Sequence, residues 1–253
     1  MTNNGGTKSR GRQKSKFYLK SMICAIMFVF IGVLGGMLGA FIYEKAKKTP
    51  ETVSSRLINT SKLNTADTVA TVADSVVDVM ADSSVGSGVV YSKDGYIITN
   101  EHVIRGAKRI EVRLKNQKKY IAAIVGVSES NDIALLKINE TNLVPVKFAN
   151  YAEVRLGETV IVIGNPLGEL SGSVTDGVVS AKERLVSVDG KQMKLMQTCA
   201  EINSGNSGGG VFRLNGELVG IVVAKSSVEN TEGLSFVIRG PDVLDSVNSI
   251  LDK

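Results

Sequence analysis

Short runs rich in valine, isoleucine and leucine recur along most of this chain, and turn residues separate them. The runs have the length of β-strands and are too short for helices. Two of the turns, Asp189-Gly190 and Asn215-Gly216, are strong hairpin signals. Many short strands at near-regular spacing predict an all-β fold, an antiparallel barrel or sandwich. We expect strands at residues 88–91, 96–99, 110–114, 120–127, 133–138, 159–163, 177–180, 218–223 and 234–238.

The strand-rich region has a distinct beginning and end. Residues 66–77 carry apolar residues at mixed spacing, which fits either a short helix or the approach to a strand. Residues 241–251 begin with a proline and place apolar residues on one side of a helix, so we expect a C-terminal helix there. The folded region is therefore 66–253, long enough for a sizeable core.

Charge and cysteine content exclude several kinds of protein. The chain has 253 residues and a net charge of +5, but residues 66–253 hold 23 acidic against 19 basic side chains. A nucleic-acid-binding surface on the folded region is therefore not supported. The two cysteines, Cys24 and Cys199, lie far apart and lack the spacing of a metal site or a disulfide framework. We expect the Cys199 thiol to lie in an apolar pocket.

A basic tail and an uncharged segment precede the folded region. Residues 1–21 carry six Lys and Arg side chains and no acidic one, and residues 22–43 carry no charge. As a helix the uncharged segment would span about 33 Å, enough for a hydrocarbon core of about 30 Å. The positive-inside rule then predicts a single-pass protein of the cell membrane with a cytoplasmic tail and an extracytoplasmic folded region. The alternative is a cleaved signal peptide, although its apolar part is normally about 7–15 residues long. Residues 44–65 are polar and predict a linker.

One histidine and one glycine-rich loop are candidates for catalysis. His102 is the single imidazole of the chain, and by itself it would more often be a structural residue. Residues 203–209 place three glycines around Ser207, which permits a tight turn that presents a nucleophile. The consecutive N–H groups of Gly205, Asn206 and Ser207 could converge as an oxyanion hole. Taken alone, such a loop is more often a plain turn.

Three motifs follow one another in the order His, Asp, Ser. The segments Thr99–Val103, Ser130–Ile138 and Gly205–Gly209 resemble the histidine, aspartate and serine motifs of the HtrA (Deg) family of trypsin-like serine proteases. The segments 156–168, 173–180, 215–221 and 233–236 are similar to that family in order and spacing as well. The resemblance covers about residues 66–238. Three collinear motifs are far more specific than any one of them.

The resemblance implies a trypsin-like double β-barrel, with the first barrel at about residues 66–150, the second at about 151–240 and a helix at 241–251. It implies a catalytic triad of His102, Asp132 and Ser207 and neither a cofactor nor a metal. An Asp before an apolar strand is by itself usually a turn residue. The specificity pocket would be bordered by Ile202, Val223, Ala224 and Lys225.

The same resemblance implies a serine endopeptidase that cleaves unfolded or damaged extracytoplasmic proteins, held to the membrane through residues 22–43. Homotrimers are usual in that family, and a homotrimer is therefore possible here. Family members commonly carry PDZ domains after the protease, whereas only 15 residues follow Ile238, so we expect none. The competing hypothesis is a protease-like fold that serves as a binding or chaperone module. An intact triad favours the enzyme.

Overall fold

The computed structural model describes residues 64–82, 84–164, 172–223 and 234–252, together with Met22, Met27, Gly32, Gly36 and Met37. Residues 1–60 and 61–253 form two separate compact units, and all the strands belong to the second. The five described residues of the first unit are helical. Most of the predicted tail, membrane segment and linker lies outside the described residues. Within the described residues, no helix is both long enough and apolar enough to cross a membrane.

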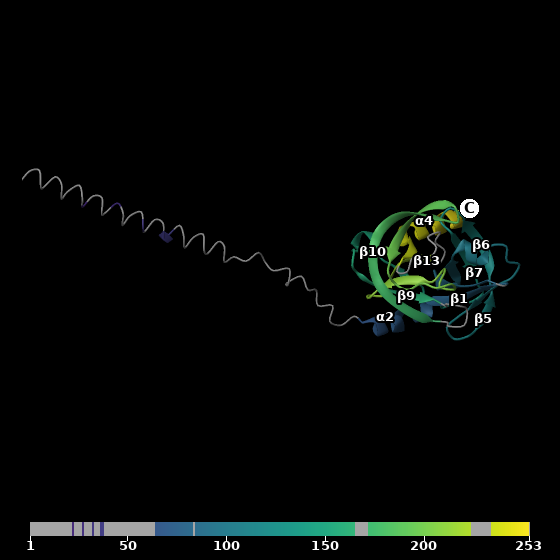
Figure 1. Cartoon of the computed structure of the whole chain (residues 1–253). Helices are drawn as coiled ribbons and strands as arrows, with labels where there is room; N and C mark the ends of the chain where they lie inside the picture. The colour runs from purple at the N-terminus through teal and green to yellow at the C-terminus, as the bar shows by residue number, and fades with distance from the viewer. Residues whose placement is uncertain are drawn as a thin grey trace, which may run out of the picture. The chain divides into compact units, whose positions relative to one another are not determined.

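Seven antiparallel strands form the first sheet, in the order β5-β4-β1-β2-β3-β7-β6. They are β1 (Val76–Ala81), β2 (Ser84–Val90), β3 (Tyr96–Thr99), β4 (Ile110–Arg113), β5 (Lys119–Ile121), β6 (Ala123–Ser128) and β7 (Ile133–Lys137). Figure 1 labels β1, β5, β6 and β7 of this sheet. Strand β1 was not expected, because its buried residues do not alternate with exposed ones. The expected strand at 120–127 is two strands, because residues up to Ala122 hydrogen-bond to β4, whereas residues from Ala123 onward pair with β7.

The second sheet also has seven strands, in the order β12-β9-β10-β11-β14-β13-β8, and the additional pairing of β12 with β13 closes six of them into a barrel. They are β8 (Lys147–Phe148), β9 (Thr159–Gly164), β10 (Ser173–Val188), β11 (Lys191–Thr198), β12 (Gly210–Arg213), β13 (Glu217–Val223) and β14 (Ser235–Arg239). Asp189 and Gly190 both have positive φ angles, and they form the predicted turn of the β10–β11 hairpin. Strands β8, β11 and β12 were not expected. Strand β11 carries lysine, glutamine and methionine rather than β-branched residues, so its composition gives a weak strand signal.

The N-terminal part of the second unit combines both structures that its sequence allowed. Helix α2 (Thr65–Val72) begins where the Asn64 side chain accepts a hydrogen bond from the Asp67 N–H, and the 3₁₀ turn η2 (Ala73–Ser75) leads from it into β1. Two further short helical elements are α3 (Glu101–Ile104) and the 3₁₀ turn η3 (Tyr151–Glu153). The expected C-terminal helix is confirmed as α4 (Gly240–Leu251), with Pro in its first turn.

A shared hydrophobic core joins the two sheets. Its largest cluster combines Ile98 and Leu135 of the first sheet with Ile161 and Leu195 of the second. Helix α4 follows the second sheet in the chain but packs on β6 and β7 of the first as well as on β13 and β14. At Gly126 a Cβ atom would lie only 2.6 Å from Ile250 Cγ2, so glycine lets this helix approach β6 closely. Helix α4 therefore packs on both sheets and links them.

Candidate active site

His102 lies on the short helix α3, directly after β3, and its side chain is 8% exposed. Its Nδ1 atom lies 2.7 Å from Asp132 Oδ2, and its backbone N–H donates to Asp132 Oδ1 at 2.9 Å. An ionised Asp132 accepts from Nδ1–H, which leaves Nε2 as an acceptor. That Nε2 lies 3.0 Å from Ser207 Oγ. The two oxygens of one carboxylate therefore orient both the ring and the backbone of His102 toward the serine.

Asp132 lies between β6 and β7 with a φ angle of 52°, in the left-handed region. Such a conformation costs on the order of 1–3 kcal/mol and persists only where the surroundings enforce it. Its carbonyl accepts from Asn100 Nδ2 at 2.9 Å and from the Glu101 N–H at 3.2 Å. The segment that carries His102 thus also holds the backbone of Asp132.

Ser207 lies in the loop between β11 and β12, where Gly205 and Gly208 have φ angles of 95° and 85°. A Cβ atom at Gly208 would lie 2.1 Å from the carbonyl oxygen of Ser87, so only glycine fits there. Ser87, on β2, donates its N–H to the Ser207 carbonyl at 2.8 Å and its hydroxyl to the Gly205 carbonyl at 2.8 Å. The first sheet therefore fixes the serine loop of the second.

The N–H groups of the serine loop do not all face the same way. The Asn206 N–H donates to the Asn203 carbonyl at 3.0 Å and closes a turn. The expectation that three consecutive donors converge is therefore wrong for Asn206, because the turn itself uses its N–H. The Oδ1 atom of Asn206 is buried and has no hydrogen-bond partner among the described residues. The backbone N–H groups of Gly205 and Ser207 remain candidate donors to an oxyanion.

This geometry agrees with the comparison with known families. A family model described as "Trypsin-like peptidase domain" matches residues 86–221, more than half of the chain. The chain belongs to the trypsin-like peptidase family. The matched range includes all three residues that the hydrogen bonds join.

Relatives within the trypsin-like peptidase family are HtrA-type serine proteases. "Serine protease Do-like HtrB" of Bacillus subtilis is 41% identical over 66% of this chain and 38% of its own length. "Serine endoprotease DegS" of Haemophilus influenzae is 40% identical over 70% of this chain and 52% of its own length. The solved structure "HtrA-type protease AlgW with tripeptide" superposes with a TM-score of 0.67 at 32% identity, covering 74% of this chain and 63% of that one. The chain is similar to these serine proteases of the HtrA/Deg type, and it spans about two fifths to one half of the length of the two relatives.

The four residues expected to border a specificity pocket are only partly described. Val223 ends β13 and is buried, next to Val222, whose backbone pairs with Gly208 and Gly209 of the serine loop. Ile202 is half-buried and packs against the apolar cluster inside the second sheet. Ala224 and Lys225 lie outside the described residues. The specificity pocket therefore remains a prediction.

Charged neighbours of the triad were missing from the sequence-based prediction. Glu101 is buried and pairs with Arg105 at 2.5 Å, and this hydrogen bond raises the pKa of Arg105 above its usual range. Arg105 Nη1 also lies 3.7 Å from Asp189 Oδ2, at the tip of the β10–β11 hairpin. The spacing of four residues between Glu101 and Arg105 could have indicated the first pair. The contact with Asp189 has no signal in the sequence.

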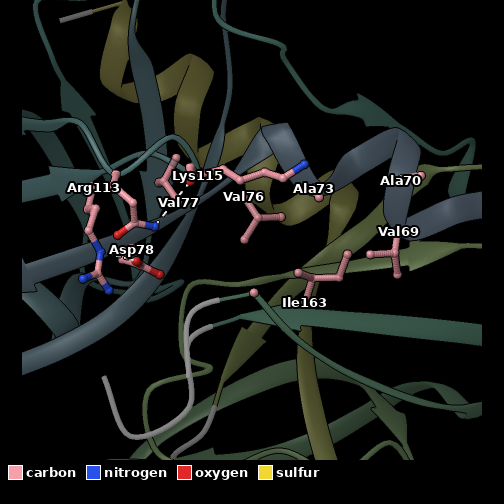
Figure 2. A pocket seen from close by; sticks show the side chains of 11 residues that line it. Val69, Ala70, Ala73, Val76, Val77, Asp78, Arg113, Lys115 and Ile163 are labelled. Carbon is pink, nitrogen blue, oxygen red and sulfur yellow. Dashed lines mark hydrogen bonds and ion pairs between the residues drawn. The ribbon is translucent and has the colours of Figure 1, made fainter. Parts of the chain in front are cut away.

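Two features of this chain lie apart from His102, Asp132 and Ser207. A cavity of about 370 Å³ is lined by Val69 of α2, Val76 of β1 and Ile163 of β9, as Figure 2 shows, and by none of the triad residues. The prediction for Cys199 is wrong, because its thiol is exposed. Thr198 takes the inward position at the end of β11 and is fully buried, so the next side chain points outward.

Proposed function

We propose that this chain is a serine endopeptidase that hydrolyses peptide bonds of unfolded or damaged extracytoplasmic proteins through Ser207, His102 and Asp132. The observation that carries the proposal is the unbroken line of hydrogen bonds from Asp132 Oδ2 to His102 Nδ1, 2.7 Å, and from His102 Nε2 to Ser207 Oγ, 3.0 Å. These distances are within the reach that proton transfer requires.

The proposed first step is the attack of Ser207 Oγ on the carbonyl carbon of the substrate. His102 Nε2 takes the hydroxyl proton as the new C–O bond forms, and Asp132 stabilises the resulting imidazolium. The same proton then passes to the leaving amine, the C–N bond breaks and an acyl-enzyme remains. Water then attacks the ester carbonyl as His102 Nε2 takes one of its protons. The C–O bond to Ser207 breaks, His102 returns this proton to Ser207 Oγ, and the new carboxylic acid leaves.

Backbone N–H groups of Gly205 and Ser207 would stabilise the oxyanion of each tetrahedral intermediate. Gly205 has a φ angle of 95°, a conformation that glycine adopts at little cost. A donor placed in this way contributes about 3–4 kcal/mol to transition-state stabilisation. Two donors suffice, so the use of the Asn206 N–H in the loop does not argue against this step.

The proposed substrate class is supported by the names of the relatives and by the way in which a serine nucleophile attacks a peptide bond. Relatives of this chain are named "Probable periplasmic serine endoprotease DegP-like", which agrees with a site outside the cytoplasm. An extended backbone has to bring its carbonyl carbon against Ser207 Oγ, and an unfolded polypeptide supplies such a backbone without first having to unfold. We further propose that residues 22–43 hold the protein in the cell membrane and that it assembles as a homotrimer.

The test compares the wild-type chain with Ser207→Ala and with the matched control Ser204→Ala, an exposed serine of the same loop. Wild type and Ser204→Ala should cleave unfolded casein and react with a fluorophosphonate at similar rates. Ser207→Ala should lose about three or more powers of ten in cleavage rate and all labelling. Binding of casein without cleavage by the wild type would instead support the binding-module hypothesis, and equal cleavage by Ser207→Ala would refute the nucleophile.

A further inference from the structure

Helix α4 touches the segment that leads into Asp132. The Asn131 side chain donates from Nδ2 to the hydroxyl of Ser246, on α4, at 2.8 Å. The two residues are 115 positions apart in the chain. Asn131 directly precedes Asp132, so a helix that follows the second sheet in the chain holds the side chain of the residue next to the aspartate of the first.

The hydroxyl of Ser246 can act only as the acceptor in this contact. Its single proton is donated to the Asp242 carbonyl, one turn earlier in α4, at 2.7 Å. Ser246 is 3% exposed, so water does not compete for its lone pair. Asp242 is itself held by Arg239, with contacts of 2.6 and 2.9 Å between the guanidinium and the carboxylate. The acceptor is therefore oriented before Asn131 meets it.

The backbone of Asp132 needs restraint on both sides because its φ angle of 52° is unfavourable. The restraints on its carbonyl come from Asn100 and Glu101, within the first sheet. On its N-terminal side, two contacts come from the second sheet and its helix: Lys191 Nζ donates to the Glu129 carbonyl at 3.0 Å, and Asn131 donates to Ser246. The contact with Ser246 is the nearer of the two, because Asn131 directly precedes Asp132. We propose that Asn131 and Ser246 are positioning residues, which keep the Asp132 carboxylate aligned with His102. This inference rests on the proposed function of the triad.

Loss of this contact should affect alignment more than folding. Asn131 is half-buried and borders a cavity of about 210 Å³ that Gln192, Lys194 and Asp242 also line. A released Asn131 amide can turn into this polar space and bind water there. Helix α4 stays anchored by Val243, Val247 and Ile250, which are buried in the shared core.

The experiment measures kcat and KM for casein with the full chain carrying Ser246→Ala, Asn131→Ala or both. Ser249→Ala, an exposed serine of the same helix, is the matched control. Each single variant should lower kcat by about three- to tenfold while KM changes less than about twofold, because only the alignment of reacting groups is lost. The double variant should be no slower than the slower single variant, since both remove the same contact. Labelling of Ser207 by a fluorophosphonate should slow in parallel with kcat.

A kcat of Ser246→Ala and Asn131→Ala equal to that of Ser249→Ala overturns the inference while leaving the triad intact. Additive losses in the double variant, or a lower unfolding temperature without a lower kcat, overturn it as well. If Ser246→Ala does not fold, Asn131→Ala alone decides, because its side chain lies at the protein surface. Absence of any cleavage that Ser207→Ala abolishes would overturn the proposed function, and this inference with it.

Discussion

Ser207 owes its position to the glycine that follows it. At Gly208 the φ angle is 85°, and a Cβ atom would lie 2.1 Å from the Ser87 carbonyl oxygen and 2.5 Å from Thr99 Oγ1. Neither neighbour can move easily, because the Thr99 hydroxyl donates to that same carbonyl at 2.7 Å. The nucleophile is thus fixed by close contact as well as by its hydrogen bonds.

We expect Gly208→Ala to lower the free energy of unfolding by about 3 kcal/mol, the sum of a left-handed alanine and a steric overlap. Casein cleavage should fall at least 100-fold, since the loop has to shift by more than about 1 Å. The matched control is Gly106→Ala, whose φ angle is 72° but whose Cβ would meet nothing within 4 Å. Gly106→Ala should lower the free energy of unfolding by about 1 kcal/mol and leave casein cleavage unchanged. Urea unfolding and casein cleavage are measured for both variants. Equal losses of stability and of cleavage rate in the two would show that steric overlap of a Cβ atom at position 208 is unimportant.

For single residues, the sequence indicated the three that the hydrogen bonds join, because the motifs around His102, Asp132 and Ser207 are specific. It did not indicate the left-handed φ angle of Asp132 or the turn that uses the Asn206 N–H. Both depend on backbone contacts between segments distant in the chain. The polarity and spacing of side chains carry no information about such contacts.

Among the elements, β8, β12 and β13 are linked by an ion network at one edge of the second sheet. Glu217 on β13 accepts from Lys147 Nζ on β8 at 2.7 Å and lies 3.4 Å from Arg213 Nη1 on β12. The hydrogen bond from Lys147, followed by that from Asn215, lowers the pKa of Glu217. The Glu217 side chain is only 17% exposed, so solvent screens these contacts incompletely.

A carboxyl group with a lowered pKa stabilises the fold above its unfolded-state pKa and loses this effect as the pH falls through its folded-state pKa. Glu217→Gln should therefore lower the free energy of unfolding by about 1 kcal/mol at pH 7. The difference from wild type should shrink as the pH falls below the ordinary glutamate pKa of about 4.3 and vanish below the lowered pKa of the folded state. Urea unfolding of both proteins at several pH values measures this difference in the free energy of unfolding. Glu129→Gln is the control, because the Glu129 side chain is 74% exposed and its contact with Lys191 is 3.8 Å long. A difference for Glu217→Gln that stays the same size as the pH falls from 7 to 3 would contradict the assigned cause.

Elements were predicted best where β-branched residues are concentrated. Residues 96–99 form β3 with the predicted bounds, and Asp189-Gly190 forms the predicted hairpin turn. Strands β1 and β11 escaped prediction for opposite reasons: β1 is buried on both faces, and β11 is rich in residues that also favour helices. In both cases pairing with neighbouring strands outweighed local preference.

Across the whole second unit, the shared cluster makes the two sheets depend on each other. Leu135 of β7 and Leu195 of β11 are both fully buried in it. The sequence indicated two groups of strands, partly through a family resemblance. No periodicity could show that their inner faces meet in one core. The uncharged segment at residues 22–43 belongs to the other unit and stays a prediction.

We expect the second unit to unfold in a single transition. Leu135→Ala and Leu195→Ala should each lower the free energy of unfolding by about 2–5 kcal/mol and move the same calorimetric peak. Leu185→Ala, at a side chain that is 68% exposed, should change it by less than about 0.5 kcal/mol. Scanning calorimetry together with far-ultraviolet circular dichroism tests this. Two separated peaks, each sensitive to one variant, would show that the sheets unfold independently.

The left-handed backbone at Asp132 limits which amino acids evolution or an engineer can place there. Asparagine tolerates that handedness but brings no negative charge, and glutamate brings the charge on a longer stem that tolerates it poorly. Glycine meets the conformational demand and has no side chain at all. Aspartate alone tolerates this backbone conformation and also carries a negative charge. We therefore expect that even the chemically similar residues asparagine and glutamate cannot replace it.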